Sequence, residues 1–118
     1  MTLVVKVTVG SDAPERCAQA FTVASVGLAA GVPVSLWLTG EASWLAMPGR
    51  AEQFVLAHSA PLAELRDAVL AGGTLTVCTQ CAARRDIEPA DLLPGVRIAG
   101  AAAFVEEVLA EGARALVY

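Results

Sequence analysis

Two cysteines separated by two residues are the strongest chemical signal in this sequence. Cys78 and Cys81 belong to the run Cys78-Thr79-Gln80-Cys81, which directly follows a β-branched segment and opens a short helix. A thiol at the start of a helix faces free backbone N–H groups and the positive end of the helix dipole, which both favour the thiolate. Arg84 and Arg85 lie within the next two turns and can add positive charge. Cys78 is therefore a candidate nucleophile that can accept sulfur and hold it as a persulfide.

The same pair of cysteines is compatible with other interpretations. Free cysteines are often buried and inert, so both can simply pack in the interior. A zinc site would need two further ligands, for which Cys17 and His58 are the soft candidates, but their spacing matches no zinc-finger pattern. A dithiol that exchanges disulfides is also possible, although a thioredoxin-type motif normally follows the first strand of its domain and this one follows the third. Packing is the favoured role of Cys17, and a surface or partly packed position is favoured for His58.

Three further polar residues follow the first two predicted strands. Glu41 comes at the end of the second strand, where it can orient a group in a site or serve as an ordinary turn residue. Ser11 and Asp12 follow Gly10 before a helix, where backbone N–H groups can hold an anion. The segment is not a G-x-G-x-x-G motif, and the Asp12 carboxylate would repel phosphate. These residues are therefore candidates for supporting a site rather than for binding a nucleotide.

Strand and helix patterns alternate along the whole chain. Strands are predicted for residues 3–9, 34–38, 74–77, 96–99 and 114–118. Helices are predicted for 13–30, 61–71, 79–85 and 100–112, with a short helical turn for 42–46, while residues 50–60 stay ambiguous. This alternation predicts a single domain over residues 1–118 in which a mostly parallel sheet of about five strands is covered by helices on both faces, a three-layer α/β/α sandwich. Ligands of such sheets gather at the carboxyl ends of the strands, where Gly10-Ser11-Asp12, Thr39-Gly40-Glu41 and Cys78 are expected to meet.

Two local signals predict where the first helix begins and ends. Asp12 can cap its N-terminus, with Pro14 in the first turn and Glu15 completing a D-x-x-E capping box. Gly31 is expected to close it.

Composition narrows the class of protein. Hydrophobic residues make up 56% of the 118-residue chain, charged residues make up 17%, and the formal net charge is −4. These values exclude a disordered chain and argue against a nucleic-acid binder, which would need a basic patch. The apolar excess suggests that a homo-oligomer covers part of the surface.

A membrane span is not expected. The 24 residues from Cys17 to Gly40 carry no charge, but Gly31-Val32-Pro33 breaks the segment and no basic cluster flanks it, so a buried helix and strand explain it better. The N-terminus shows no signal-peptide pattern, and we expect a cytoplasmic protein.

Three segments of the chain resemble the DsrE-like proteins, which share the YchN-like fold and include small sulfur-relay subunits of sulfur oxidation and tRNA thiolation. They are Val7–Asp12 with Arg16, Val32–Glu41, and Val77–Arg85 followed by Asp91–Val96 and Ala99-Gly100-Ala101. In that family the sulfur-accepting cysteine follows the third strand, which matches Cys78, and many members carry a second cysteine matching Cys81. One departure is Asp86, where the family often has glycine, so a different loop shape is expected after the short helix.

The resemblance implies a function and an assembly. It implies that sulfur is accepted as a persulfide on Cys78 from a donor protein and passed to an acceptor protein, without an organic cofactor. It also implies a homotrimer or homohexamer with the cysteines near subunit interfaces. The alternatives are a non-catalytic oligomeric binding or regulatory protein of the same fold, or a thiol redox or metal-binding protein that uses Cys78 and Cys81.

Overall fold

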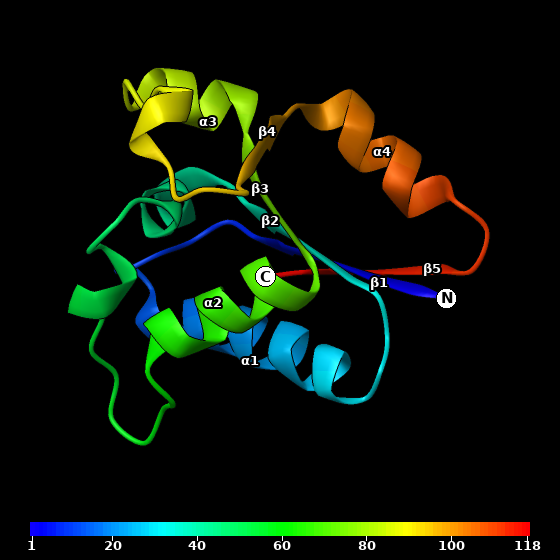
Figure 1. The fold of residues 1–118 in the computed structure, drawn as a ribbon, viewed down its shortest axis with the longest axis horizontal. Coiled ribbons are helices and arrows are strands. Elements are labelled where there is room, and N and C mark those ends of the chain that lie inside the picture. The colour runs from blue at the N-terminus through cyan, green and yellow to red at the C-terminus, as the bar shows by residue number, and fades with distance from the viewer.

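A five-stranded parallel sheet organises the chain. The computed structural model describes residues 1–118, and its strands lie in the order β4-β3-β2-β1-β5 (Figure 1). Every neighbouring pair is parallel. The strands are β1 (Thr2–Val7), β2 (Val34–Leu38), β3 (Thr74–Cys78), β4 (Arg97–Ala99) and β5 (Ala113–Val117).

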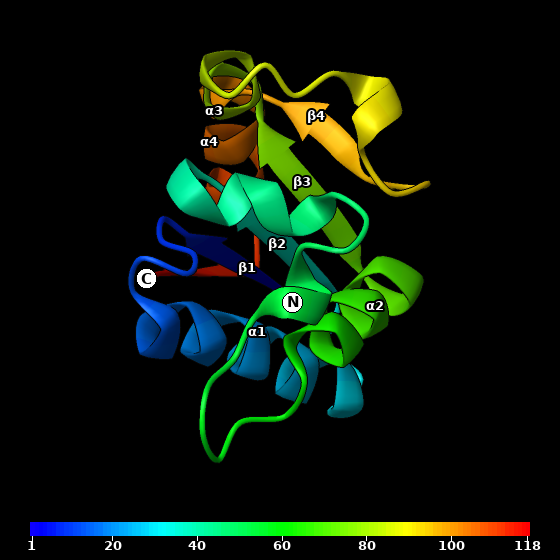
Figure 2. The same cartoon turned by 90° about the vertical axis from the view of Figure 1, so that its left-hand side faces the viewer.

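Helices cover both faces of this sheet. Helices α1 (Pro14–Ala29) and α2 (Leu62–Gly72) lie on one face, and α3 (Thr79–Arg84) and α4 (Ala101–Leu109) lie on the other (Figures 1 and 2). Short 3-10 turns occupy Gly40–Ala46, Ala51–Gln53 and Pro89–Asp91. The predicted three-layer α/β/α architecture with a parallel sheet is confirmed.

The hydrophobic core fills the space between the sheet and the helices α1 and α2. Because side chains alternate along a strand, every second residue of the central strands points to this side. Completely or almost completely buried side chains line it from the strands and from both helices, namely Val5, Val7, Leu36, Leu38, Leu75, Val77, Phe21 and Val69. This layer fixes the position of the strand ends, including the end of β3 where Cys78 lies.

The start of α1 differs from the prediction. Ala13 is the N-cap residue and no side chain caps the helix, so the expected capping box of Asp12 and Glu15 is wrong. The Asp12 carboxylate instead accepts a hydrogen bond from the backbone N–H of Gly10 at 2.8 Å, which closes the turn after β1. The other end agrees with the prediction, since α1 stops before Gly31, whose φ of +81° is in the left-handed region that favours glycine.

The charge-free segment between Cys17 and Gly40 forms most of α1 and all of β2, as expected. None of the helices in the structure combines the length and the hydrophobicity required to cross a bilayer.

Candidate functional site

The loops that follow β1 and β2 meet at the carboxyl edge of the sheet, next to the end of β3. Two glycines permit this approach. A Cβ on Gly40, whose φ is +53°, would lie 2.4 Å from the carbonyl oxygen of Thr8, and a Cβ on Gly10 would lie 2.6 Å from the carbonyl oxygen of Glu41. Any larger residue would push the loops apart. The expected meeting of Gly10–Asp12, Thr39–Glu41 and Cys78 at one edge is therefore seen in the structure.

Cys78 is the last residue of β3 and the N-cap residue of α3, and its side chain is half-buried. The thiol donates a hydrogen bond to the side-chain oxygen of Gln80 at 3.4 Å. Burial of the sulfur opposes ionisation. The backbone N–H groups of Cys81 and Gln80, the Cys81 thiol and the charge of Lys6 outweigh burial, so the pKa of Cys78 is lowered from its ordinary value of 9.0. Cys78 therefore combines partial exposure with a lowered pKa.

Lys6 is the residue of this site that sequence reasoning missed. It lies in β1 in register with Trp37 of β2, which is in register with Thr76 of β3, so Lys6 shares a sheet face with Cys78, two residues beyond Thr76. Its Nζ lies 4.7 Å from the ring centroid of Phe104, and it forms no ion pair with a carboxylate. The available signal was the single charge within the apolar run from Leu3 to Val9.

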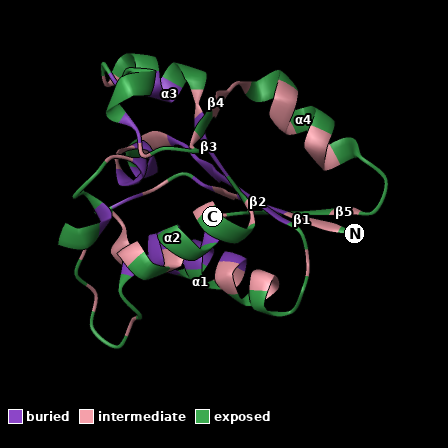
Figure 3. Cartoon of the chain, in the orientation of Figure 1, coloured by how far each residue is buried: buried purple, intermediate pink, exposed green.

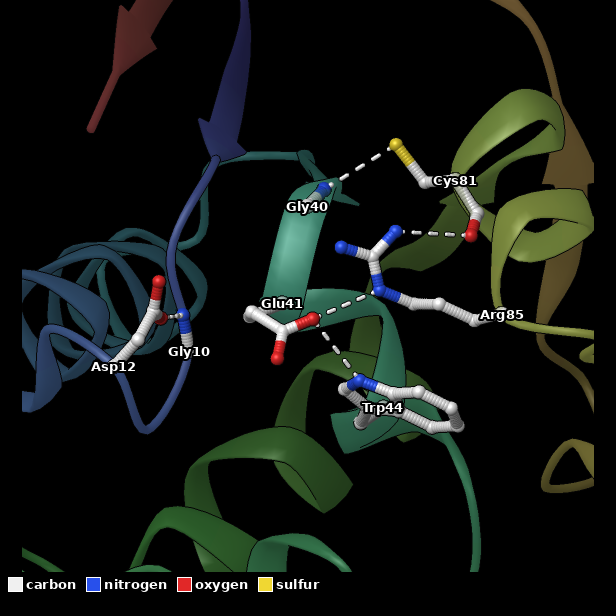
Figure 4. A network of polar contacts seen from close by, with 7 residues as sticks. All are labelled: Gly10, Asp12, Gly40, Glu41, Trp44, Cys81 and Arg85. Carbon is white, nitrogen blue, oxygen red and sulfur yellow. Dashed lines mark hydrogen bonds and ion pairs between the residues drawn. The ribbon is translucent and has the colours of Figure 1, made fainter.

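Cys81 lies deeper than Cys78. Its residue is only 8% exposed, and its sulfur accepts a hydrogen bond from the backbone N–H of Gly40 at 3.2 Å (Figure 4). The donor comes from the loop after β2, so this contact joins α3 to the neighbouring strand end.

Glu41 and Arg85 hold α3 against the same loop. The Arg85 Nε donates to a Glu41 carboxylate oxygen at 2.9 Å, the Trp44 indole N–H donates to the same oxygen at 3.1 Å, and Arg85 Nη1 donates to the carbonyl of Cys81 at 3.1 Å (Figure 4). Arg84, the predicted electrostatic aid, is exposed and makes no such contact. The structure therefore connects Arg85, not Arg84, to the backbone that carries Cys81, and it gives Glu41 an orienting contact.

Ser11 and Asp12 line a cavity of about 260 Å³ beside this network. Glu41, Trp44 and Arg50 contribute to its wall. The Arg50 guanidinium lies 4.6 Å from the Trp44 ring centroid. Asp12 occupies the Gly10 N–H group, one of the donors that an anion would have used. The two residues border the site, but the structure shows no contact between either of them and the sulfur of Cys78 or Cys81.

Cys17 and His58 lie outside the cysteine pair. Cys17 is completely buried, and burial together with the nearby charge of Asp12 raises its pKa to about 12, so it is not a second reactive thiol. His58 lies in an exposed loop with a φ of +59° and borders a separate cavity of about 750 Å³ formed with α1. No three His, Cys, Asp or Glu side chains come together as a set that could hold a metal ion.

The loop after α3 contains Asp86, the position at which the DsrE-like proteins often have glycine. Asp86 has a φ of +53°, in the left-handed region where glycine is favoured. The backbone thus takes the conformation that a glycine would adopt there without strain, and aspartate is one of the few other residues that tolerate it.

Comparisons with known proteins place this geometry in context. The model of the DsrE/DsrF-like family matches residues 1–118. The crystal structure of the YchN protein from E. coli is similar with a TM-score of 0.77 and 17% sequence identity over 100% of both chains. A protein of unknown function from Methanobacterium thermoautotrophicum is similar with a TM-score of 0.63 and 12% identity, over 99% of this chain and 98% of the other. A comparison with curated proteins finds no match. The two structural similarities support the fold.

Proposed function

This chain belongs to the DsrE/DsrF-like family, and on that premise we propose that it is a small sulfur carrier that accepts sulfane sulfur as a persulfide on Cys78. The observation that carries the proposal is the state of Cys78, which is half-buried and has a lowered pKa. A thiolate is the nucleophilic form of cysteine, and it must be reachable to react with a donor. Cys17 does not meet either requirement.

The chemistry has two balanced steps. The Cys78 thiolate attacks the outer sulfur of a donor persulfide, a new S–S bond forms on Cys78, and the donor leaves as its own thiolate. A nucleophile on the acceptor then attacks the outer sulfur of the Cys78 persulfide, which returns Cys78 to the thiolate. Lys6 and the N–H groups of Gln80 and Cys81 stabilise negative charge on the Cys78 sulfur. Neither step needs an organic cofactor. Because the first step needs Cys78 as a free thiol, the proposal includes a reducing compartment such as the cytoplasm.

We further propose that copies of this chain assemble as a trimer or a hexamer. Strand β5 is an edge strand whose Leu116 and Val117 are 42% and 64% exposed, and neighbouring α4 exposes Val105 and Leu109 by 50% and 78%. A monomer that leaves such an edge open is prone to further pairing, and a symmetric oligomer is the common way to cover it. Light scattering of the purified chain measures the assembly, and a monomer at micromolar concentration would contradict this proposal.

Intact mass spectrometry tests the sulfur-carrier function. After brief treatment with a low-molecular-weight persulfide, we expect an increase of about 32 mass units per sulfur atom bound. Cys78→Ser should abolish the adduct, whereas Cys17→Ser is the matched control that should retain it. An adduct that survives Cys78→Ser, or no adduct on any variant, would reject the proposal in favour of a protein whose thiols only pack.

A further inference from the structure

We propose that Cys81 is a resolving thiol, which attacks the Cys78 persulfide, releases hydrosulfide and leaves a Cys78–Cys81 disulfide. This inference rests on the proposed function, because it concerns the fate of sulfur that Cys78 has accepted. It gives the chain a second activity, the reduction of sulfane sulfur to sulfide, in addition to relay.

The position of Cys81 is set by contacts from two other segments. Gly40 directs its backbone N–H at the Cys81 sulfur over 3.2 Å, and Arg85 binds the Cys81 carbonyl. Gly40 lies close to Thr8, where a Cβ would be only 2.4 Å from the carbonyl oxygen, so the loop that carries the donor is closely packed. The Cys81 sulfur is therefore held in place by a hydrogen bond from a neighbouring loop.

The two thiols are close and unequal. Residues three apart at the start of a helix lie on the same face, and the Cys81 thiol is close enough to Cys78 to favour its thiolate through a hydrogen bond. Cys78 is half-buried and can meet a donor from solution, whereas Cys81 is 8% exposed. A donor therefore loads Cys78 first, and Cys81 reacts afterwards within the same chain. An intramolecular thiol held beside its target acts at a very high effective concentration.

The step balances without any other reactant. The Cys81 thiolate attacks the inner sulfur of the Cys78 persulfide, which is the Sγ atom of Cys78. The bond between that atom and the outer sulfur breaks, and the outer sulfur leaves with the electron pair as hydrosulfide. The outer sulfur is reduced by two electrons, and the two cysteines are oxidised to a disulfide. Low-molecular-weight thiols can return the disulfide to the dithiol for another cycle.

This chemistry makes the acceptor compete with Cys81. An acceptor that attacks the outer sulfur quickly receives it as sulfane sulfur. If no acceptor is bound, the same sulfur is discharged as sulfide. The buried position of Cys81 therefore sets how long a persulfide survives on Cys78.

A single-turnover experiment on the full chain separates the two proposals. Wild type, Cys81→Ser, Cys81→Ala and Cys17→Ser are each loaded with a low-molecular-weight persulfide and freed of excess donor. Their intact masses and the sulfide released are then followed over time. For wild type and Cys17→Ser we expect the gain of about 32 mass units to disappear, with one sulfide per chain and a final mass about 2 units below the reduced chain. Both Cys81 variants should keep the gain, with sulfide release at least about tenfold slower because the intramolecular thiol is gone.

Two results would overturn the inference. They differ in whether they also contradict sulfur acceptance on Cys78. If wild type keeps the gain as long as both Cys81 variants and releases no sulfide, the resolving step is wrong while sulfur acceptance on Cys78 stands. If neither Cys81 variant takes up sulfur although circular dichroism shows that both are folded, the proposed function falls and the resolving step falls with it.

Discussion

The two faces of the sheet are built from different residues. Toward α1 and α2 the sheet presents aliphatic side chains that pack around Phe21 and are almost completely buried. Toward α4 it presents a row across the strands that includes Lys6, Trp37 and Thr76, and no residue of α4 is itself buried (Figure 3). The face toward α1 and α2 therefore carries the aliphatic core, whereas the other face is covered by a helix that is itself only partly buried.

The α4 face is held by directional contacts instead of tight apolar packing. Glu107 accepts hydrogen bonds from Ser35, from the Trp37 indole and from Arg97. Phe104 meets Trp37 edge to face, with 5.4 Å between the ring centroids. Such contacts depend on charge and on exposure to solvent more strongly than a buried aliphatic core does. The comparison teaches that Lys6, whose charge acts on Cys78, belongs to the less tightly packed face toward α4.

The largest expected effect is on the free energy of unfolding, and it differs between two phenylalanines on opposite faces of the sheet. Phe21→Ala removes a completely buried ring, and we expect it to lower the free energy of unfolding by about 3–5 kcal/mol. Phe104→Ala removes a half-buried ring, and the loss should be less than half as large. Urea unfolding followed by circular dichroism measures both values. Equal losses would show that the two faces contribute alike and would break the comparison.

A smaller effect is expected at Glu107. Its pKa is lowered, since hydrogen bonds from Arg97, Ser35 and Trp37 outweigh the cost of burial. A lowered pKa means that the carboxylate stabilises the fold above its ordinary pKa of 4.5 and that this contribution is lost as the pH falls below that value. Glu107→Gln should lower stability at pH 7 by about 1 kcal/mol.

The pH dependence of that variant provides the control. Below pH 4.5 the stabilities of wild type and Glu107→Gln should converge, because the wild-type carboxylate becomes protonated and loses its extra contribution. A difference between the two proteins that stays constant from pH 7 to pH 3 would show that the charge of Glu107 has no role on this face.

The smallest expected effect is a change in the pKa of Cys78 when Lys6 is replaced. It tests whether a residue of the α4 face acts on this cysteine. The rate of Cys78 alkylation should rise with pH around a midpoint below 9.0, because the pKa of Cys78 is lowered. Lys6→Met should move that midpoint upward, since the positive charge that favours the thiolate is lost. Lys6→Arg keeps the charge and is the matched variant, which should leave the midpoint close to that of wild type. A midpoint that moves equally in both variants would indicate a packing effect instead of a charge effect.

Much of the fold could be predicted because its signals are local. The segment from Val34 to Leu38 was predicted with the bounds that the structure shows, and the parallel order followed from the alternation of strands and helices. Helix ends were less accurate. The last long helix stops at Leu109 instead of Gly112, and Asp12 bonds the Gly10 N–H instead of capping α1. In both places several hydrogen-bonding arrangements compete over one or two residues, and the pattern of residue types does not decide among them.

The site was predictable only in part for a different reason. Cys78 and Cys81 are neighbours in sequence, so their pattern was visible. The contact from Gly40 to Cys81 spans 41 residues and depends on how tightly the loops after β1 and β2 approach each other. The contact of Glu41 with Arg85, and not with Arg84, depends on how the chain leaves the C-terminal end of α3. Lys6 is brought to the cysteine by strand register, which the sequence of β1 alone does not contain.

The most direct test of the account is to locate the sulfur after exposure to a persulfide donor by peptide mapping of the trapped protein. The account predicts that the extra sulfur is found on the peptide that carries Cys78 and Cys81, that it is assigned to Cys78 in the Cys81→Ser variant, and that the Cys17 peptide stays unmodified. Sulfur on Cys17, or an unmodified Cys78 peptide in folded Cys81→Ser protein, would contradict it.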